Sequence, residues 1–366
     1  MNKEVSLRQI AYTFLFISLA QLLRQLPTAL AQTAGRSGYL SPLWSVIVMV
    51  PITAIIIVLI KAFPGMNFYE IMVQLIGKLL AKLFILFYFL WILLGITTKI
   101  NAYSMTLQFT LMPQTRSDFF MVILIVLVYY ALMRGMKAVF RFSEFTLGTI
   151  LVFFIVLFIC AFSKLRLEYL LPISTTYLPE TLWASKHVLA IGGNIILALF
   201  FADKFGIMVT KFQIRKLWYA ILVFTVLSFL LTVFTYGVTG ASLTSILPFP
   251  FYITVKSISF FNLMERFEVL VTVICVLSDF ISICIFAIIL IRSFEWLFGL
   301  KPNNYIFVPM TVIVFYLTYY ISSTQFESNY LYKNVIENLN LVFELMVPLF
   351  LGFIYLLKRN KIKNQY

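Results

Sequence analysis

Long apolar runs separated by short polar segments dominate the pattern of this chain. A helix that crosses a bilayer needs about 20 predominantly apolar residues. Ten stretches fit this requirement, with approximate limits 9–31, 39–61, 80–110, 118–138, 143–163, 188–210, 214–238, 265–297, 304–323 and 340–358. The pattern predicts an all-α integral membrane protein with ten transmembrane helices, in which residues 1–366 form a single domain.

Two of the longer connections carry signs of interfacial structure. Within residues 62–79, Pro64 and Gly65 predict a turn that opens an amphipathic helix lying at the membrane surface. Pro248 and Pro250 similarly break the chain before residues 251–264. The connections leave no room for a separate soluble domain.

The composition excludes several classes of protein. Apolar residues make up 62% of the chain and charged residues 11%, whereas soluble domains have roughly 45–50% and about 25%. A soluble enzyme, a secreted disulfide scaffold and a disordered chain are therefore excluded.

We interpret the net charge of +14 as determining how the chain is oriented in the membrane, and not as a sign of nucleic-acid binding. With the N-terminus inside, 18 Lys and Arg residues lie on the inner side and 8 on the outer side, so the positive-inside rule predicts that both termini are cytoplasmic. The basic tail from Lys358 to Lys363 suits anionic membrane lipid. No nucleic-acid partner is expected.

The ten predicted helices divide into two sets with matching spacing. The first set covers about residues 9–163 and the second about 188–358; the third and eighth helices are the two longest, and an interfacial segment precedes each. Because five is an odd number, the second set must be inverted in the membrane. This is the five-plus-five inverted-repeat (LeuT-like) layout of transporters, in which substrate binds near the midplane between broken helices.

The sixth predicted helix contains the sequence Gly192-Gly193-Asn194. Each glycine costs about 1 kcal/mol in a helix interior, so the pair favours a local break that lines a ligand site. The alternative is that the glycines allow close helix packing. The first helix has no glycine before Gly35, and only Pro27 disturbs it, near its outer end.

Four ionisable residues lie inside predicted helices, where charges are costly unless paired or hydrated. They are Arg24, Lys99, Asp203 and Asp279, on the first, third, sixth and eighth helices. Those four helices surround the central site of a five-plus-five transporter, so all four residues are candidates for ligand or ion binding. By depth, Lys99 and Asp279 are expected to face one another. The alternative is structural ion pairs that hold helices in register.

The chain lacks the residues that a catalytic site or a metal site requires. The chain has one histidine, His187, expected at the membrane interface, and three cysteines, Cys160, Cys275 and Cys284, all in apolar runs. A zinc site needs about four N or S ligands close together, and no hydrolase signature occurs. No catalytic residue, metal or cofactor is predicted, and the protein is not expected to be an enzyme.

Short motifs spread along the chain resemble the B-subunit permeases of bacterial spore germination receptors, a branch of the amino acid–polyamine–organocation transporter superfamily. The segments that carry the resemblance are Leu26-Pro27, Ala34-Gly35-Arg36-Ser37-Gly38-Tyr39-Leu40-Ser41, Phe63-Pro64-Gly65-Met66-Asn67-Phe68-Tyr69-Glu70-Ile71, Leu75-Ile76-Gly77-Lys78, Glu265-Arg266-Phe267-Glu268 and Pro348 before the basic tail. Their order and spacing over essentially the whole chain carry more weight than any one of them.

The resemblance implies a protein of the spore inner membrane that senses a small nutrient, typically an amino acid. It implies a complex with a membrane-bound A subunit and a lipoprotein C subunit. Ligand binding at the central site would shift a conformational equilibrium that starts germination, which requires tighter binding to one state than to the other.

The first helix departs from the family pattern. Members often have a glycine-containing break just before the Leu-Pro pair, whereas here residues 20–25 read Ala-Gln-Leu-Leu-Arg-Gln. Two explanations stay open: Arg24 anchors the carboxylate of a different ligand, or this copy has lost nutrient binding. Backbone amides near Gly192 and Gly193 offer a further place for a carboxylate.

Two other functions remain as alternatives. One is a proton- or sodium-coupled secondary transporter of amino acids or related amines. The other is a structural subunit whose central site is vestigial.

Overall fold

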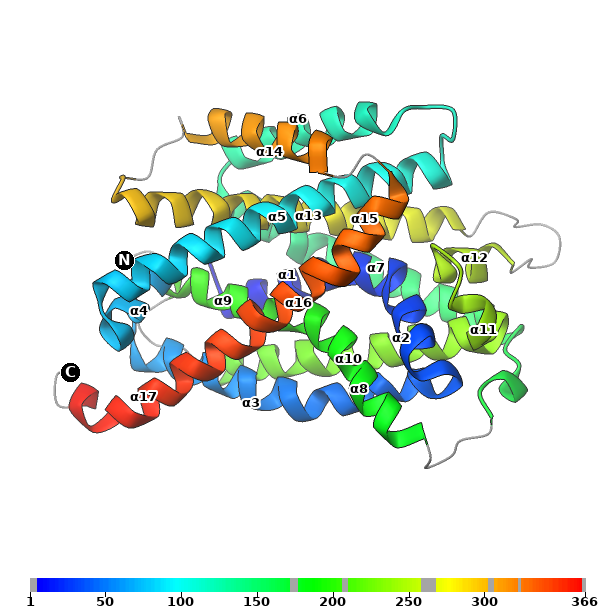
Figure 1. Cartoon of the computed structure of the whole chain (residues 1–366), viewed down its shortest axis with the longest axis horizontal. Helices are drawn as coiled ribbons and strands as arrows, with labels where there is room; N and C mark the ends of the chain where they lie inside the picture. Colours follow the sequence, from blue (N-terminus) through cyan, green and yellow to red (C-terminus); the bar gives the residue numbers. More distant parts are fainter. Residues whose placement is uncertain are drawn as a thin grey trace.

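The computed structural model describes residues 5–171, 177–205, 210–257, 268–301, 306–321 and 324–363. These residues form helices and connecting turns, and no strand occurs among them (Figure 1). The all-α prediction is therefore confirmed for the described chain. Three residues of the Glu265-Arg266-Phe267-Glu268 motif, and residues 258–264 of the second interfacial segment, lie outside it.

The helices follow one another with short connections. Their bounds are α1 Leu7–Arg24, α2 Leu26–Ala34, α3 Ser41–Ala62, α4 Phe68–Ile76, α5 Lys78–Thr110, α6 Ser117–Met133, α7 Met136–Phe162, α8 Leu178–Gly192, α9 Leu197–Phe200, α10 Lys211–Thr239, α11 Ala241–Thr244, α12 Pro250–Lys256, α13 Glu268–Phe298, α14 Phe307–Ile321, α15 Gln325–Leu331, α16 Glu337–Asn340 and α17 Val347–Lys363. Within the described ranges, seven helical segments are long and apolar enough to cross a membrane, and α6 and α14 are shorter apolar helices. The protein is therefore built as a multi-pass membrane protein.

Two segments form the interior of the bundle. The apolar window of α13 is 83% buried and that of Leu178–Phe200 is 78% buried, against 39–56% for the other long segments. Helix α1 lies between them, packs on α13 and α10, and buries most of its side chains. The helices that carry Arg24, Gly193 and Asp279 are therefore inside the protein rather than facing lipid.

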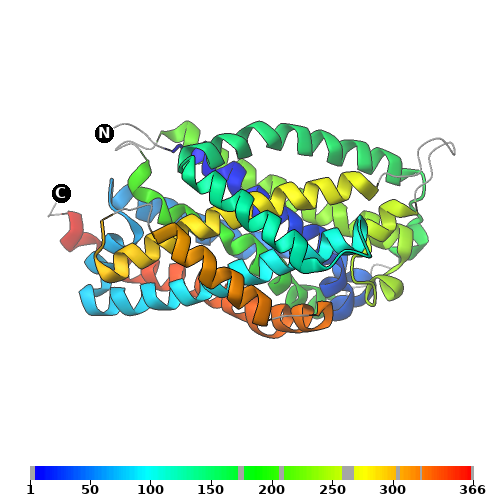
Figure 2. The same cartoon turned by 90° about the horizontal axis from the view of Figure 1, so that it is seen from above.

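The peripheral helices pack around this interior. Helices α6 and α14 lie side by side along one edge, against α5, while α17 crosses α3 and α4 on another side (Figure 1). The start of α1 and the end of α17 lie at the same end of the bundle in both views (Figures 1 and 2). The count of ten spans, the inverted repeat and the cytoplasmic termini stay predictions.

The predicted interfacial helix in residues 62–79 is α4. Asn67 accepts the amide of Glu70 at 2.9 Å, and the Glu70 carboxylate accepts the amide of Asn67 at 2.8 Å. This reciprocal pairing is a capping box, which satisfies amides that the first helical turn leaves unpaired. Gly77, with φ of +88°, ends α4 and lets α5 start at a new angle.

The first predicted helix is divided although it contains no glycine at the division. Helix α1 ends at Arg24, Gln25 departs from helical geometry with φ of −114°, and α2 begins at Leu26. Pro27 explains the division because it has no amide to donate to the carbonyl four residues earlier. The expectation that Pro27 disturbs this helix is confirmed, and the division lies two residues before the proline.

The sixth predicted helix begins earlier and is less regular than expected. Helix α8 starts at Leu178, ten residues before the predicted limit, and ends at Gly192. A 3₁₀ segment follows at Gly193–Ile196, then α9 and a second 3₁₀ turn at Ala202–Lys204. The early start was missed because Pro179, Glu180, Lys186 and His187 interrupt the apolar pattern of this segment, whose mean hydropathy is only 1.4.

The last long helical segment contains two π-helical stretches, Tyr332–Ile336 and Leu341–Met346. Pro348 lacks the amide that would bond to the Glu344 carbonyl in a regular α-helix, which favours the wider turn there. Such turns often occur at functional sites.

Candidate functional site

A buried ion pair joins Arg24 at the end of α1 to Asp279 in the middle of α13. Nη1 of Arg24 lies 2.6 Å from Oδ2 of Asp279, and Nη2 lies 2.7 Å from Oδ1. The two residues are 5% and 1% exposed. Nη1 also donates to the Thr106 hydroxyl at 3.0 Å, which ties α5 to the pair. Two parallel charge-assisted hydrogen bonds fix both side chains in orientation.

The residue before Asp279 holds open a turn of α1. The Ser278 hydroxyl accepts the amide of Ala20 at 3.0 Å and donates to the carbonyl of Phe16. These two backbone groups bond to each other in a regular α-helix. A side chain inserted between them is a recognised cause of helix distortion, so α13 shapes α1 at the depth of the ion pair.

Lys99 does not pair with Asp279, which corrects the expected arrangement. Its amino group lies 3.5 Å from the carbonyl oxygen of Ile17 and 5.0 Å from the centre of the Phe286 ring. It forms no ion pair in the part of the chain that the structure describes. Asp279 pairs instead with Arg24, whose longer side chain reaches along α1 to the same depth.

The glycines of the sixth helix are positions of close packing. A Cβ atom on Gly192 would lie 2.7 Å from the Met49 side chain, and one on Gly193 would lie 2.5 Å from the Glu344 side chain. The Asn194 amide donates to the Ile191 carbonyl at 2.8 Å. The change from α to 3₁₀ helix occurs at these residues, but the backbone stays helical. The two glycines therefore allow close packing at the point where the helix type changes.

Asp203 belongs to a different cluster, near the C-terminal end of α13. Arg292 donates to both oxygens of Asp203 at 2.7 Å and to the carbonyl of Phe200 at 2.7 Å. Arg292 is 13 residues from Asp279, which separates the two ion pairs by about 20 Å along the helix axis. Asp203 thus joins the sixth and eighth helices but does not take part in the Arg24 site.

Sequence reasoning missed Glu344, which is fully buried on the second π-helical stretch. It lies inside the predicted helix 340–358, so the rule that singled out Asp279 applied equally to it. Its two carboxylate oxygens have no hydrogen-bond partner.

His187, for which the sequence predicts a position at the membrane interface, is covered by other side chains of the protein. It is buried, with Nδ1 2.6 Å from an oxygen of Glu337 and Nε2 2.8 Å from the Thr33 hydroxyl. This chain of three side chains connects α8, α16 and α2. Asn340 adds a second connection nearby, since it accepts from the Trp91 indole and donates to the Ala190 carbonyl, both at 2.9 Å.

Two small cavities touch Arg24. One of about 20 Å³ is lined by Gln25, Met105, Phe249 and Asn329 among others, and one of about 10 Å³ by Thr106 and Cys275 among others. Spaces of this size hold about one water molecule. An amino acid therefore enters only if the Arg24 and Asp279 side chains separate or the helices move.

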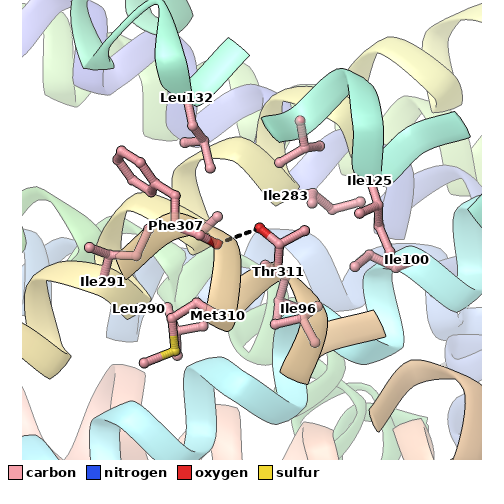
Figure 3. A pocket seen from close by; sticks show the side chains of 13 residues that line it. Ile96, Ile100, Ile125, Leu132, Ile283, Leu290, Ile291, Phe307, Met310 and Thr311 are labelled. Atoms are coloured by element: carbon pink, nitrogen blue, oxygen red, sulfur yellow. Dashed lines mark hydrogen bonds between the residues drawn. The ribbon is translucent and has the colours of Figure 1, made fainter. Parts of the chain in front are cut away.

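A third cavity, of about 30 Å³, lies between α5, α6, α13 and α14 and is apolar (Figure 3). Its polar lining residue, Thr311, donates its hydroxyl to the Phe307 carbonyl at 2.7 Å. Nothing there is placed to recognise a charged ligand.

The pair of Arg24 and Asp279 suits the recognition of a zwitterion. A guanidinium group binds a carboxylate through two hydrogen bonds, and a buried carboxylate binds an ammonium group. A ligand that carries both charges can replace both partners at once. Among the described residues, no group of three or more His, Cys, Asp or Glu side chains is placed to hold a metal ion.

Comparisons with known proteins agree with this architecture. The model of the family described as "Spore germination protein" matches residues 5–330. A comparison with curated proteins finds no match. Among solved structures, a mutant of the manganese transporter of Eremococcus coleocola is similar with a TM-score of 0.63 and 13% sequence identity, over 94% of this chain and 78% of that one.

The structural likeness shows a transporter-type fold, and the match to the family model covers most of the chain. The predicted family resemblance is confirmed: the chain belongs to the spore germination permease family.

Proposed function

We propose that this chain is the nutrient-sensing subunit of a germination receptor in the inner membrane of bacterial spores. In this proposal it works with a membrane-bound A subunit and a lipoprotein C subunit, and its ligand is a small amino acid. Ten spans with both termini in the cytoplasm, arranged as inverted repeats over about residues 9–163 and 188–358, form its framework. Family membership supports the link to germination.

The observation that carries the proposal is the bidentate Arg24–Asp279 pair beneath cavities too small for a ligand. Removing one partner of a buried pair costs about 3–5 kcal/mol because the other charge is left unpaired. A zwitterion avoids this cost, since its carboxylate takes the place of Asp279 and its ammonium group the place of Arg24.

Replacement of the Arg24–Asp279 ion pair by contacts with the ligand also changes how α1 and α13 are joined. When the ligand separates Arg24 from Asp279, α1 and α13 lose the ion pair that joins them, next to the turn that Ser278 holds open through Phe16 and Ala20. The ligand then binds the separated state better than the closed state, which is the requirement for a population shift. The shift passes to the A and C subunits.

The test is germination of spores that carry Arg24→Gln or Asp279→Asn, scored against receptor abundance. We expect the response to amino acids to fall at least about tenfold per receptor, the loss that accompanies a charge-assisted contact of about 1.5–3 kcal/mol. Arg116→Gln is the matched control, because Arg116 forms an exposed ion pair with Asp118. A normal response per receptor in both buried-site variants would refute the proposal.

A secondary transporter of amino acids is the second candidate, favoured by the likeness to a metal-ion transporter. Accumulation of a labelled amino acid against its gradient, in vesicles that contain this chain alone, would establish transport. Equilibration without accumulation would leave the sensing function as proposed.

A further inference from the structure

Glu344 is a buried carboxylate without a hydrogen-bond donor. The residue has no solvent exposure, and neither oxygen has a partner among the described residues. Two other buried carboxylates are placed differently: Asp279 accepts from Arg24, and Glu337 faces His187. Glu344 alone of these three lacks a neighbour that compensates its charge at contact distance.

Gly193 packs closely against one side of the Glu344 carboxyl group and leaves no space for another group there. A Cβ atom on Gly193 would lie 2.5 Å from both Cβ and Oε2 of Glu344. The 3₁₀ segment of the sixth helix thus rests directly on the acid. No hydrated cation fits between the two residues.

The titratable groups around Glu344 come from several helices. Lys99 on α5 is the basic side chain whose charge acts on it, and Lys99 forms no ion pair with it. Tyr88 on α5 donates its hydroxyl to the carbonyl of Phe343 at 2.7 Å. Tyr332, Glu337 and His187 are the further titratable groups on the neighbouring π-helical stretch, α16 and α8, while Gly193–Ile196 carries none. No cation is in contact with the carboxyl group from any of these elements.

An ionised carboxylate in an apolar interior is strongly unfavourable unless it is paired or hydrogen-bonded, and such a group binds a proton instead. We propose that Glu344 is a proton-binding site, which holds a proton at neutral pH while Gly193 packs against it. Water that enters the site is the group able to receive this proton, and the positive charge of Lys99, over the Phe286 ring, then favours the carboxylate that is left. The ligand of the site is the proton itself.

The site links protonation to movement of the sixth helix. If the segment Gly193–Ile196 moves away from the π-helical stretch, water reaches Glu344 and the ionised form becomes favourable. The proton is then released. This inference does not depend on which ligand Arg24 and Asp279 bind, so its test is separate from the germination assay.

The experiment is infrared spectroscopy of the purified full-length protein in vesicles of phosphatidylcholine and phosphatidylglycerol. At neutral pH we expect the carbonyl-stretch band of a protonated carboxylic acid, which shifts in deuterated water. Glu344→Gln should lose this band and Glu344→Asp should shift it. Glu144→Gln, which removes a partly exposed acid paired with Arg8, should keep it.

Two results would overturn the proposal. The first is the absence of any protonated-carboxyl band from the wild-type protein at neutral pH, which needs no variant to fold. The second is a band that persists unchanged in Glu344→Gln.

Discussion

Arg24 and Asp279 face each other across the contact between α1 and α13, joined by two hydrogen bonds of 2.6 and 2.7 Å. Both residues lie on helices that the rest of the bundle covers. The pair is thus a structural connection between two central helices and the place where opposite charges are available to a ligand. These two roles predict different effects for different substitutions.

Asp279→Asn should destabilise the protein. It leaves Arg24 buried, 5% exposed, without a counter-charge, and this loss costs about 3–5 kcal/mol. The expected result is a lower unfolding temperature of the detergent-solubilised protein and a lower abundance in the membrane. Asp118→Asn, in the exposed pair with Arg116, should change stability by less than about 1 kcal/mol. Equal effects of the two substitutions would contradict the account.

Gly193→Ala should also be destabilising, for a steric reason. The new Cβ would lie 2.5 Å from Glu344, and overpacking of this kind costs about 1–3 kcal/mol. Gly148 on α7 provides the matched control, because nothing lies within 4 Å of a Cβ built there. Gly148→Ala should leave stability unchanged or raise it by up to about 1 kcal/mol. Thermal unfolding of both variants measures the difference, and a stable Gly193→Ala protein would show that the glycine is not required for packing.

His187 and Glu337 should be energetically coupled. Their side chains lie 2.6 Å apart and are both buried. A double-mutant cycle with His187→Gln and Glu337→Gln should give a coupling free energy of about 0.5–3 kcal/mol. Additive effects on the free energy of unfolding would mean that the contact contributes nothing. Thr33→Val tests the third member of the chain, whose hydroxyl lies 2.8 Å from the imidazole.

Much of the fold follows from hydropathy, and the failures have physical causes. Long lipid-facing helices such as α5 and α10 are strongly apolar and were located within a few residues. The first half of α8 was missed because Pro179, Glu180 and Lys186 interrupt its apolar pattern. The division at Gln25 depends on the missing amide of Pro27, which the sequence already marks as the residue that disturbs this helix.

The sequence names Arg24 and Asp279 as candidates but does not predict that they pair. Arg24 and Asp279 were both identified as charges within helices, yet depth along separate helices does not determine which side chains meet. Arg24 reaches Asp279 and leaves Lys99 beside the Ile17 carbonyl. Glu344 could have been identified by the same criterion, because it is an acid inside a predicted span.

The most direct test of the central claim is germination of spores with the charge-reversed pair, Arg24→Asp together with Asp279→Arg, measured per receptor present in the membrane. The reversed pair restores the ion pair between α1 and α13. It also places an acid where the carboxylate of the ligand would bind and a base where its ammonium group would bind, so both contacts become repulsive. The account predicts that receptor abundance recovers relative to either single variant, while the response to amino acids stays at least about tenfold below wild type. A reversed pair that germinates like wild type would show that the two residues only hold the helices together.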